Sequence, residues 1–213
     1  DEEVSVELER QFGRQGIEFA TSASVSGVEK KNGRLAVQYE VNGEKKEFVC
    51  DKVLLGVGVQ PNTDGIGLEN VGIKTVGPGY INVDGNMRTN VGGVYAVGDV
   101  NGKLMLAHVA FDQGVVAAET IAGHAPQPID DYTNMPRCTY AQPQIASIGL
   151  TEAQAREQGI NLKIGKVPFA VAGKSVAIGE PQGFVKVLTD DDSGAIVGAH
   201  IIGPEATELI AEI

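Results

Sequence analysis

The stretch from Gly93 to Asp99 constrains the fold of this chain more than any other. It reads Gly-Val-Tyr-Ala-Val-Gly-Asp, a short apolar run that ends in a glycine and an acid. Such a run predicts a strand buried on both faces, as in the parallel sheets of α/β proteins. A second apolar run, Lys52–Val59, has the same character. Because open α/β sheets bind ligands beyond the carboxyl ends of their strands, we expect Asp99 to face a ligand crevice.

The segments before these runs predict one helix and an antiparallel meander. A helix is expected over Glu3–Gly16, where Val4, Leu8 and Phe12 recur every four residues. Two Asn-Gly turns, at Asn32 and Asn42, separate residues 25–31, 35–41 and 44–50, and every second residue from Leu35 to Val41 is a large apolar side chain. Asn-Gly between alternating segments is a strong hairpin signal, so three strands are predicted here.

The second half of the chain changes character after a polar, proline-bearing linker at residues 125–131. Before the linker, Ala107–Gly123 has the period of a helix that stops at its glycine. After it, strands are predicted at residues 144–150, 184–189 and 195–202, and Thr151 has the type and place of a helix N-cap. We therefore expect three parts, residues 1–64, 65–131 and 132–213. The pattern is α/β up to the linker and α+β after it.

Composition excludes several classes of partner. The chain has a net charge of −11, and such a field repels nucleic acid and anionic membranes. No apolar run approaches the roughly 20 residues that span a bilayer. Cys50 and Cys138 lie far apart among apolar or mixed neighbours, which favours reduced, packed thiols in a cytosolic protein over a disulfide.

The two ends predict a fragment of a longer protein. The chain begins without methionine, and Glu205–Ile213 has a helical pattern with no stop signal behind it.

Asp99 itself has two interpretations that the local pattern leaves about equal. A carboxylate beyond a strand can accept hydrogen bonds from a sugar or ribityl hydroxyl. It can equally cap the turn that follows the strand.

The wider context resembles one family. The run from Thr89 to Asp99, followed by Met105-Leu106-Ala107-His108, resembles the second FAD-binding motif of the pyridine nucleotide-disulfide oxidoreductases. The Met-Leu-Ala-His tetrapeptide looks like the dihydrolipoamide dehydrogenase branch. Residues 135–152 and 198–203 are similar to the family's interface domain, and Leu54–Pro61 to the end of its NAD-binding domain. The likeness covers the whole chain.

This resemblance implies a fold and a set of site residues. The fold is α/β, with the C-terminal parts of Rossmann-like NAD-binding and FAD-binding domains followed by an α+β interface (dimerisation) domain. Residues 1–64, 65–131 and 132–213 would be these three parts. The residues implied to contact FAD are Asp99, Met105, Leu106, Ala107 and His108. Those implied near NAD are Val25 and Gly58, the glycine allowing close approach of the cofactor. As alternatives, Val25 is a plain strand residue and His108 a hydrogen-bonded histidine without a catalytic role.

Other family motifs are absent from these residues, so no catalytic or metal-binding residue is assigned. Neither G-x-G-x-x-G nor the redox C-x4-C motif occurs here. His200 and Glu205 share the spacing of the family's catalytic His-Glu dyad. We interpret His200 as structural, since it lies in an alternating strand and the family's dyad reads His-Pro-Thr-x-Ser-Glu.

The resemblance implies that the full-length protein oxidises protein-bound dihydrolipoamide with FAD and NAD, as a homodimer that serves the lipoyl domains of 2-oxoacid dehydrogenase complexes. A bacterial protein of this kind would be cytoplasmic, a eukaryotic one mitochondrial. The isolated segment would be inactive. Two alternatives stay open: another flavin disulfide reductase, or a non-catalytic unit for dimerisation and cofactor clamping.

Overall fold

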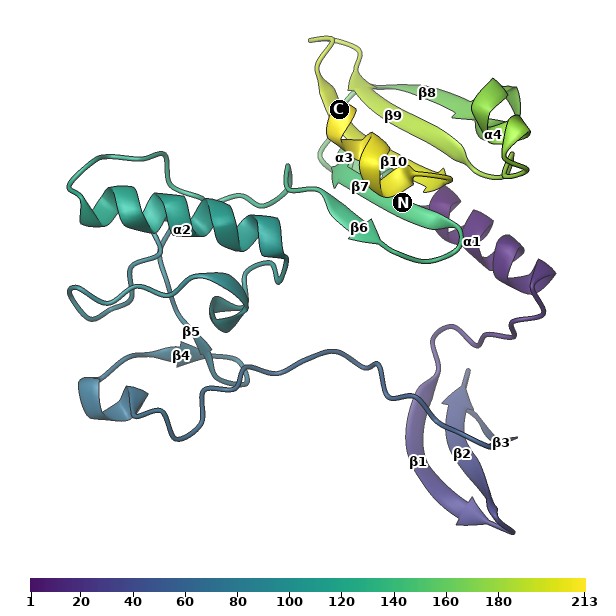
Figure 1. Cartoon of the computed structure of the whole chain (residues 1–213), viewed down its shortest axis with the longest axis horizontal. Helices are drawn as coiled ribbons and strands as arrows, with labels where there is room; N and C mark the ends of the chain where they lie inside the picture. The colour runs from purple at the N-terminus through teal and green to yellow at the C-terminus, as the bar shows by residue number, and fades with distance from the viewer. The chain divides into compact units, whose positions relative to one another are not determined.

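The computed structural model describes all 213 residues, which form two compact units. The smaller unit, Gln11–Val59, contains the predicted meander (Figure 1). Its strands are β1 (Ser24–Lys31), β2 (Arg34–Val41) and β3 (Glu44–Cys50), paired antiparallel in the order β1-β2-β3. The two predicted hairpin turns are confirmed, because Asn32 and Asn42 both have positive φ, as such turns require.

The strand predicted at Lys52–Val59 is wrong for this structure. The segment is irregular, and no strand pairs with it. Its apolar side chains are exposed, with Leu54 at 95% and Val57 at 85%. A strand buried on both faces needs neighbouring strands to supply its hydrogen bonds and its cover, and no described strand lies beside this one.

The larger unit consists of Asp1–Arg10 and Gln60–Ile213, and in it the residues after Gln60 form short elements packed on one long helix. These elements are η1 (Leu68–Val71), β4 (Thr75–Val76), β5 (Tyr80–Ile81), η2 (Gly98–Asn101) and α2 (Ala107–Ile121). Their shared core consists of Ile81, Val83, Met87, Ala96 and Ala117. The helix predicted at Ala107–Gly123 is confirmed as α2.

The strand predicted at Gly93–Asp99 is also wrong. The segment makes a single bridge, between Arg88 and Tyr95, and then turns into the 3-10 helix η2. Thr89 N–H donates to the Val94 carbonyl and Ala96 N–H to the Met87 carbonyl, so the backbone folds back on itself. Asp99 therefore lies inside a tight helical turn and not just beyond a strand end.

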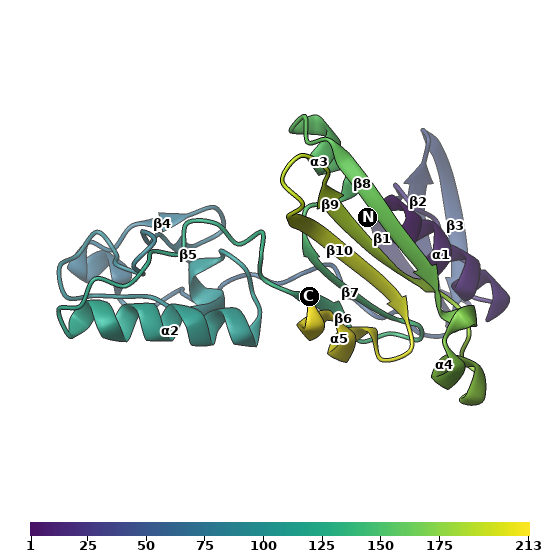
Figure 2. The same ribbon diagram turned by 90° about the horizontal axis from the view of Figure 1, so that it is seen from above.

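Residues 137–203 build a five-stranded antiparallel sheet in the order β6-β7-β10-β9-β8 (Figure 2). The strands are β6 (Arg137–Thr139), β7 (Gln144–Gly149), β8 (Leu162–Pro168), β9 (Phe184–Asp190) and β10 (Ile196–Gly203). Short helices lie between the strands, α3 (Glu152–Glu157), η3 (Phe169–Val171) and α4 (Gly173–Ala177), and two more follow β10, α5 (Ala206–Leu209) and η4 (Ile210–Glu212). Thr151 caps α3 in a reciprocal capping box with Gln154, as its type predicted.

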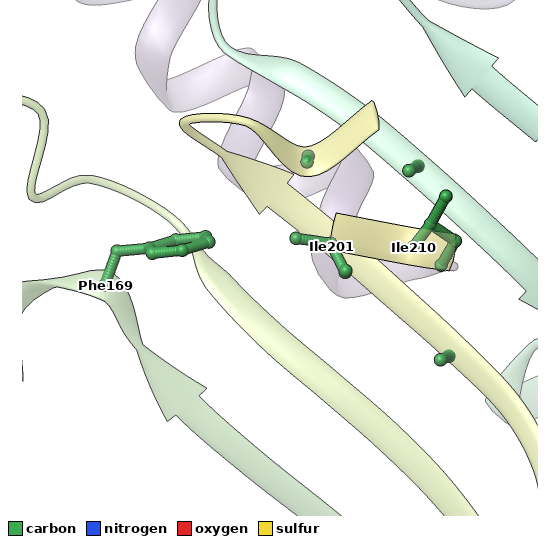
Figure 3. Packing of buried hydrophobic residues seen from close by; sticks show 6 residues of the cluster. Phe169, Ile201 and Ile210 are labelled. Atoms are coloured by element: carbon green, nitrogen blue, oxygen red, sulfur yellow. The ribbon is translucent and has the colours of Figure 1, made fainter. Parts of the chain in front are cut away.

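Alternating side chains of the central strand β10 pack on opposite faces of this sheet. Ile201 joins a cluster with Phe169 and Ile210 on one face (Figure 3). Ile202 joins Phe184 and Val4 on the other, which brings α1 (Glu2–Arg14) onto that face. The amphipathic helix predicted at the start of the chain is thus confirmed, and its first turns cover the sheet.

A buried lysine fixes α1 to the sheet by charge as well as by packing. Lys186 of β9 is 1% exposed and pairs with Asp1, Glu3 and Glu152, at distances from Nζ to the carboxylate oxygens of 2.6 to 3.1 Å. These carboxylates come from the start of α1 and from the first turn of α3. No helix of the structure combines the length and apolarity needed to cross a membrane.

Candidate functional site

Asp99 presents an unpaired carboxylate at the start of η2. Gly98, with φ of 77°, directs the chain into this turn, and its position lies against Ala110 of α2. The Asp99 side chain is exposed and makes no hydrogen bond or ion pair. The turn is closed by the Gly102 N–H, which donates to the Asp99 backbone carbonyl at 3.1 Å. The capping interpretation of the side chain finds no support, because Asp99 leaves its carboxylate free to accept.

Beneath the turn lies a pair of buried amides. Gln113 of α2 is fully buried, and its Oε1 accepts hydrogen bonds from Gly98 N–H at 2.7 Å and from Asn101 Nδ2 at 2.8 Å. Asn101, 3% exposed, also donates to the Ala96 carbonyl at 3.3 Å. Gln113 Nε2 donates in turn to the Tyr132 hydroxyl at 3.1 Å. Both ends of η2 are therefore bound to one side chain of α2.

The tetrapeptide Met105–His108 forms the N-terminal end of α2. Leu106 is the N-cap residue in extended conformation, and no side chain caps the helix. The first N–H groups of a helix have no partner within it, so this end offers free backbone donors and a partial positive charge. The Nε2 atom of His108 lies 2.9 Å from the carbonyl of Pro136, consistent with the hydrogen-bonded alternative.

Tyr80 braces the loop between Asp99 and Met105. Its ring occupies the space beside Gly102, where a Cβ atom would lie 2.5 Å from the ring. Its hydroxyl donates to the Met105 sulfur at 3.7 Å. The loop is thus supported from β5 as well as from α2.

These groups fit the flavin cofactor implied by the sequence. FAD presents hydroxyl donors on its ribityl chain and carbonyl acceptors on its ring. Asp99 provides a free acceptor for hydroxyl groups, and the uncapped end of α2 provides donors for carbonyl oxygens. Donors and acceptors of this chain therefore complement those of the cofactor.

The two residues expected near NAD lie in the smaller unit. Val25 of β1 is 62% exposed and faces Tyr39 in the sheet register, beside a bulge. Gly58 has φ of 106°, a conformation that requires glycine, and no atom lies within 4 Å of the place of its missing Cβ. Both positions leave room for a ligand, and their contact with NAD stays a prediction.

The remaining reactive groups, the two cysteines, His200 and the charges around Lys186, lie in surroundings that indicate structural roles. Both cysteines are free, and burial raises the pKa of the Cys138 thiol. His200 is 1% exposed, its Nε2 lies 3.0 Å from the Leu150 carbonyl, and it makes no hydrogen bond to Glu205. No group of three or more acidic, histidine or cysteine side chains is arranged to hold a metal ion. A cleft of about 1070 Å³ is lined by the Lys186 cluster, where salt bridges already pair the charges.

Three functional candidates were missed by sequence reasoning: Asn101, Gln113 and Tyr132. Their contacts join positions 12 to 19 residues apart across a turn and a linker. One signal was available. Gln113 occupies the same helical face as Val109, Val116 and Ala117, which are all buried, and a polar residue on an apolar face indicates a buried hydrogen-bond partner.

Comparison with known proteins identifies relatives over the whole chain. It is 44% identical over 213 residues to the dihydrolipoyl dehydrogenase of Mycobacterium leprae and 43% identical over 214 residues to that of Bacillus subtilis. Each match covers 100% of this chain but only 46% of the first enzyme and 45% of the second. The chain therefore spans about half the length of the curated relatives it matches.

Solved structures share the fold. LpdA of Mycobacterium tuberculosis matches the whole chain with a TM-score of 0.88 and 28% identity, over 45% of its own length. The HOCl-induced flavoprotein disulfide reductase RclA of Escherichia coli matches 98% of the chain with a TM-score of 0.89. At 24% identity the second likeness shows the fold alone.

Family sequence models divide the chain into two matches. Residues 1–114 match the pyridine nucleotide-disulphide oxidoreductase model, and residues 135–213 match the dimerisation domain of the same family. The family and its dihydrolipoyl dehydrogenases use FAD and NAD, which agrees with the cofactors expected from the sequence. The α/β fold with a terminal interface domain is confirmed, while the three domain boundaries stay a prediction. From these matches, this chain belongs to the pyridine nucleotide-disulphide oxidoreductase family.

Proposed function

We propose that the intact protein is an FAD-dependent, NAD-linked dihydrolipoyl dehydrogenase and that these residues hold its flavin and its dimer interface. The observation that carries the proposal is the Met-Leu-Ala-His N-terminal end of α2, which lies directly after the turn that exposes the Asp99 carboxylate. The identity of 40–44% with dihydrolipoyl dehydrogenases along the whole chain supports it.

Within this proposal each part of the chain has a role. Asp99 accepts hydrogen bonds from ribityl hydroxyls, and Met105–His108 line the flavin ring. The N–H groups at the start of α2 stabilise negative charge on the ring carbonyls. Val25 and Gly58 lie beside NAD. FAD, when bound, carries the two-electron chemistry, and the side chains of this segment position it.

The dimerisation match supports a homodimer built through the sheet of residues 137–203. The substrate class is a dihydrolipoyl group, so the partners are lipoyl domains of 2-oxoacid dehydrogenase complexes. The two free cysteines support a reducing compartment, which would be the cytoplasm of a bacterial cell or the mitochondrial matrix of a eukaryotic one.

The proposal is tested first by flavin binding of the intact protein. We expect a yellow protein with one FAD per chain, which reduces NAD when dihydrolipoamide is added. Asp99→Ala should weaken FAD binding about tenfold or more, because a hydrogen bond to a charged acceptor contributes roughly 1.5–3 kcal/mol. The matched control is Asp112→Ala, which removes the same charge from an exposed position of α2 and should leave FAD binding unchanged.

The outcomes separate the remaining alternatives. A flavin-loaded dimer that forms no NADH from dihydrolipoamide, but turns over another disulfide or mercuric ion, would identify a different reductase. A dimer that binds no flavin would leave a dimerisation role only, and the dehydrogenase proposal would be abandoned.

A further inference from the structure

We infer that Gln113 is a positioning residue for the flavin, acting through the turn that carries Asp99. The inference rests on the proposed function, because it takes FAD as the ligand of Asp99. It adds a residue that neither the family resemblance nor the sequence pattern assigned to the site. The argument comes from hydrogen bonds, burial and the donor and acceptor chemistry of one side chain.

Gln113 holds both ends of the Asp99 turn with a single oxygen. Its Oε1 accepts from the N–H of Gly98, the first residue of the turn, at 2.7 Å, and from Nδ2 of Asn101, the last residue of the turn, at 2.8 Å. The Asp99 carboxylate has no partner of its own. Its direction is therefore set by the backbone on either side, and that backbone is held by Gln113.

The orientation of the Gln113 amide is itself fixed. Its Nε2 donates to the Tyr132 hydroxyl at 3.1 Å, so the oxygen must face the turn. Asn101 is fixed as well, because its Oδ1 accepts from Lys103 N–H at 3.1 Å. Gln113 is fully buried, and a buried donor that loses its partner is costly.

Two substitutions at this position separate hydrogen bonding from packing. Gln113→Glu keeps an oxygen that accepts from Gly98 and Asn101, and its second oxygen can accept from the Tyr132 hydroxyl. Gln113→Met keeps a similar length but removes the acceptor, which leaves two buried donors unmatched. If Gln113 positions Asp99, the glutamate variant should bind FAD and the methionine variant should bind it poorly.

The experiment measures the dissociation constant for FAD in the intact protein. We expect the dissociation constant of Gln113→Glu to stay within about threefold of the parent value. Gln113→Met should bind FAD about tenfold more weakly, because losing the hydrogen bond between Asp99 and the flavin costs roughly 1.5 kcal/mol. Asn101→Ala removes only one of the two bonds and should weaken binding about threefold. It provides the test should Gln113→Met fail to fold.

A double-mutant cycle shows whether the effect passes through Asp99. In an Asp99→Ala background, Gln113→Met should weaken FAD binding by no more than about twofold, since the group it positions is gone. A purely structural role would give the same tenfold loss in both backgrounds. Val83→Ala, a truncation in the core cluster of the same region, controls for loss of stability.

The result that would overturn the inference is distinct from failure of the proposed function. If the parent protein binds no FAD, the proposed function fails. If the parent binds FAD but Gln113→Met and Asn101→Ala bind it equally well, or if the losses are additive with Asp99→Ala, Gln113 is not a positioning residue.

Discussion

The ammonium nitrogen of Lys186 lies 2.6 Å from a carboxylate oxygen of Glu152, with the lysine side chain only 1% exposed. Asp1, equally buried, lies 3.1 Å from the same nitrogen. Hydrogen bonds to Glu152 and Glu3 raise the pKa of Lys186 against the opposing effect of burial, so the side chain stays charged. The cluster therefore balances charges that neither α1 nor the sheet could bury alone.

Removing this lysine should be strongly destabilising. We expect Lys186→Met to lower the free energy of unfolding by about 3–5 kcal/mol, because it leaves the Asp1 carboxylate buried without a counter-charge. Lys166→Met is the matched control, since Lys166 also pairs with Glu3 but is 39% exposed, and its pair is worth at most about 1 kcal/mol. Urea denaturation of both variants checks the difference, and equal midpoints would contradict it.

His200 should make stability depend on pH in a narrow range. Burial holds the pKa of this imidazole below its ordinary value of 6.5, and Lys186 on the facing strand lowers it further. Well above pH 6.5 the ring is neutral in the folded and unfolded chain alike. As the pH falls below 6.5, the unfolded chain takes up the proton first, so the free energy of unfolding decreases.

The substitution His200→Gln should flatten this acid-side decline above the range where carboxylates titrate. Denaturation midpoints measured between pH 7 and 5.5 provide the check. A decline of the same slope in the variant would show that another group is responsible.

Two glycines of the same sheet should respond oppositely to alanine. A Cβ at Gly198 in β10 would lie 2.1 Å from the Leu150 carbonyl oxygen, whereas a Cβ at Gly165 in β8 would meet no atom within 4 Å. Gly198→Ala should therefore destabilise the protein by about 2 kcal/mol or more, as overpacking does. Gly165→Ala should stabilise it by about 0.5 kcal/mol, because alanine loses less backbone entropy on folding. Thermal unfolding of the two variants compares them directly, and equal shifts would refute the predicted clash.

Cys138 should react slowly with thiol reagents. Burial raises the pKa of its thiol above the ordinary value of 9.0, and only the thiolate attacks such reagents. In a Cys50→Ser variant we expect the rate of modification to keep rising beyond pH 9.

Unfolding the parent chain without reductant should expose both thiols of this segment, and finding neither would reveal a disulfide.

Local patterns predicted much of the fold, and tertiary pairing explains the rest. The meander, α1, α2 and the strands β7, β9 and β10 follow from periodicity and turn residues that act within a few positions. The two apolar runs failed for a different reason. Lys52–Val59 and Gly93–Asp99 have strand composition, but a strand forms only where another strand offers its hydrogen bonds, and composition does not reveal that partner.

The candidate site shows the same division. Asp99 and Met105–His108 could be named because they lie close together in the sequence and resemble a family motif. Asn101 and Tyr132 could not, since each contributes through a partner that the fold brings to it, and the place of Gln113 on the apolar face of α2 indicated a buried partner without identifying it. The two amides are buried, and a hydrogen bond between buried groups depends on geometry that the fold supplies.

The exposed segment Lys52–Val59 has a practical consequence for work with this chain. Leucine and valine side chains in water, beside peptide groups that no strand pairs with, are a template for intermolecular β-pairing. Repulsion from the net charge of −11 opposes such association but acts over the whole surface. A charged residue placed at Leu54, the most exposed of these side chains, should therefore raise the solubility of these 213 residues on their own.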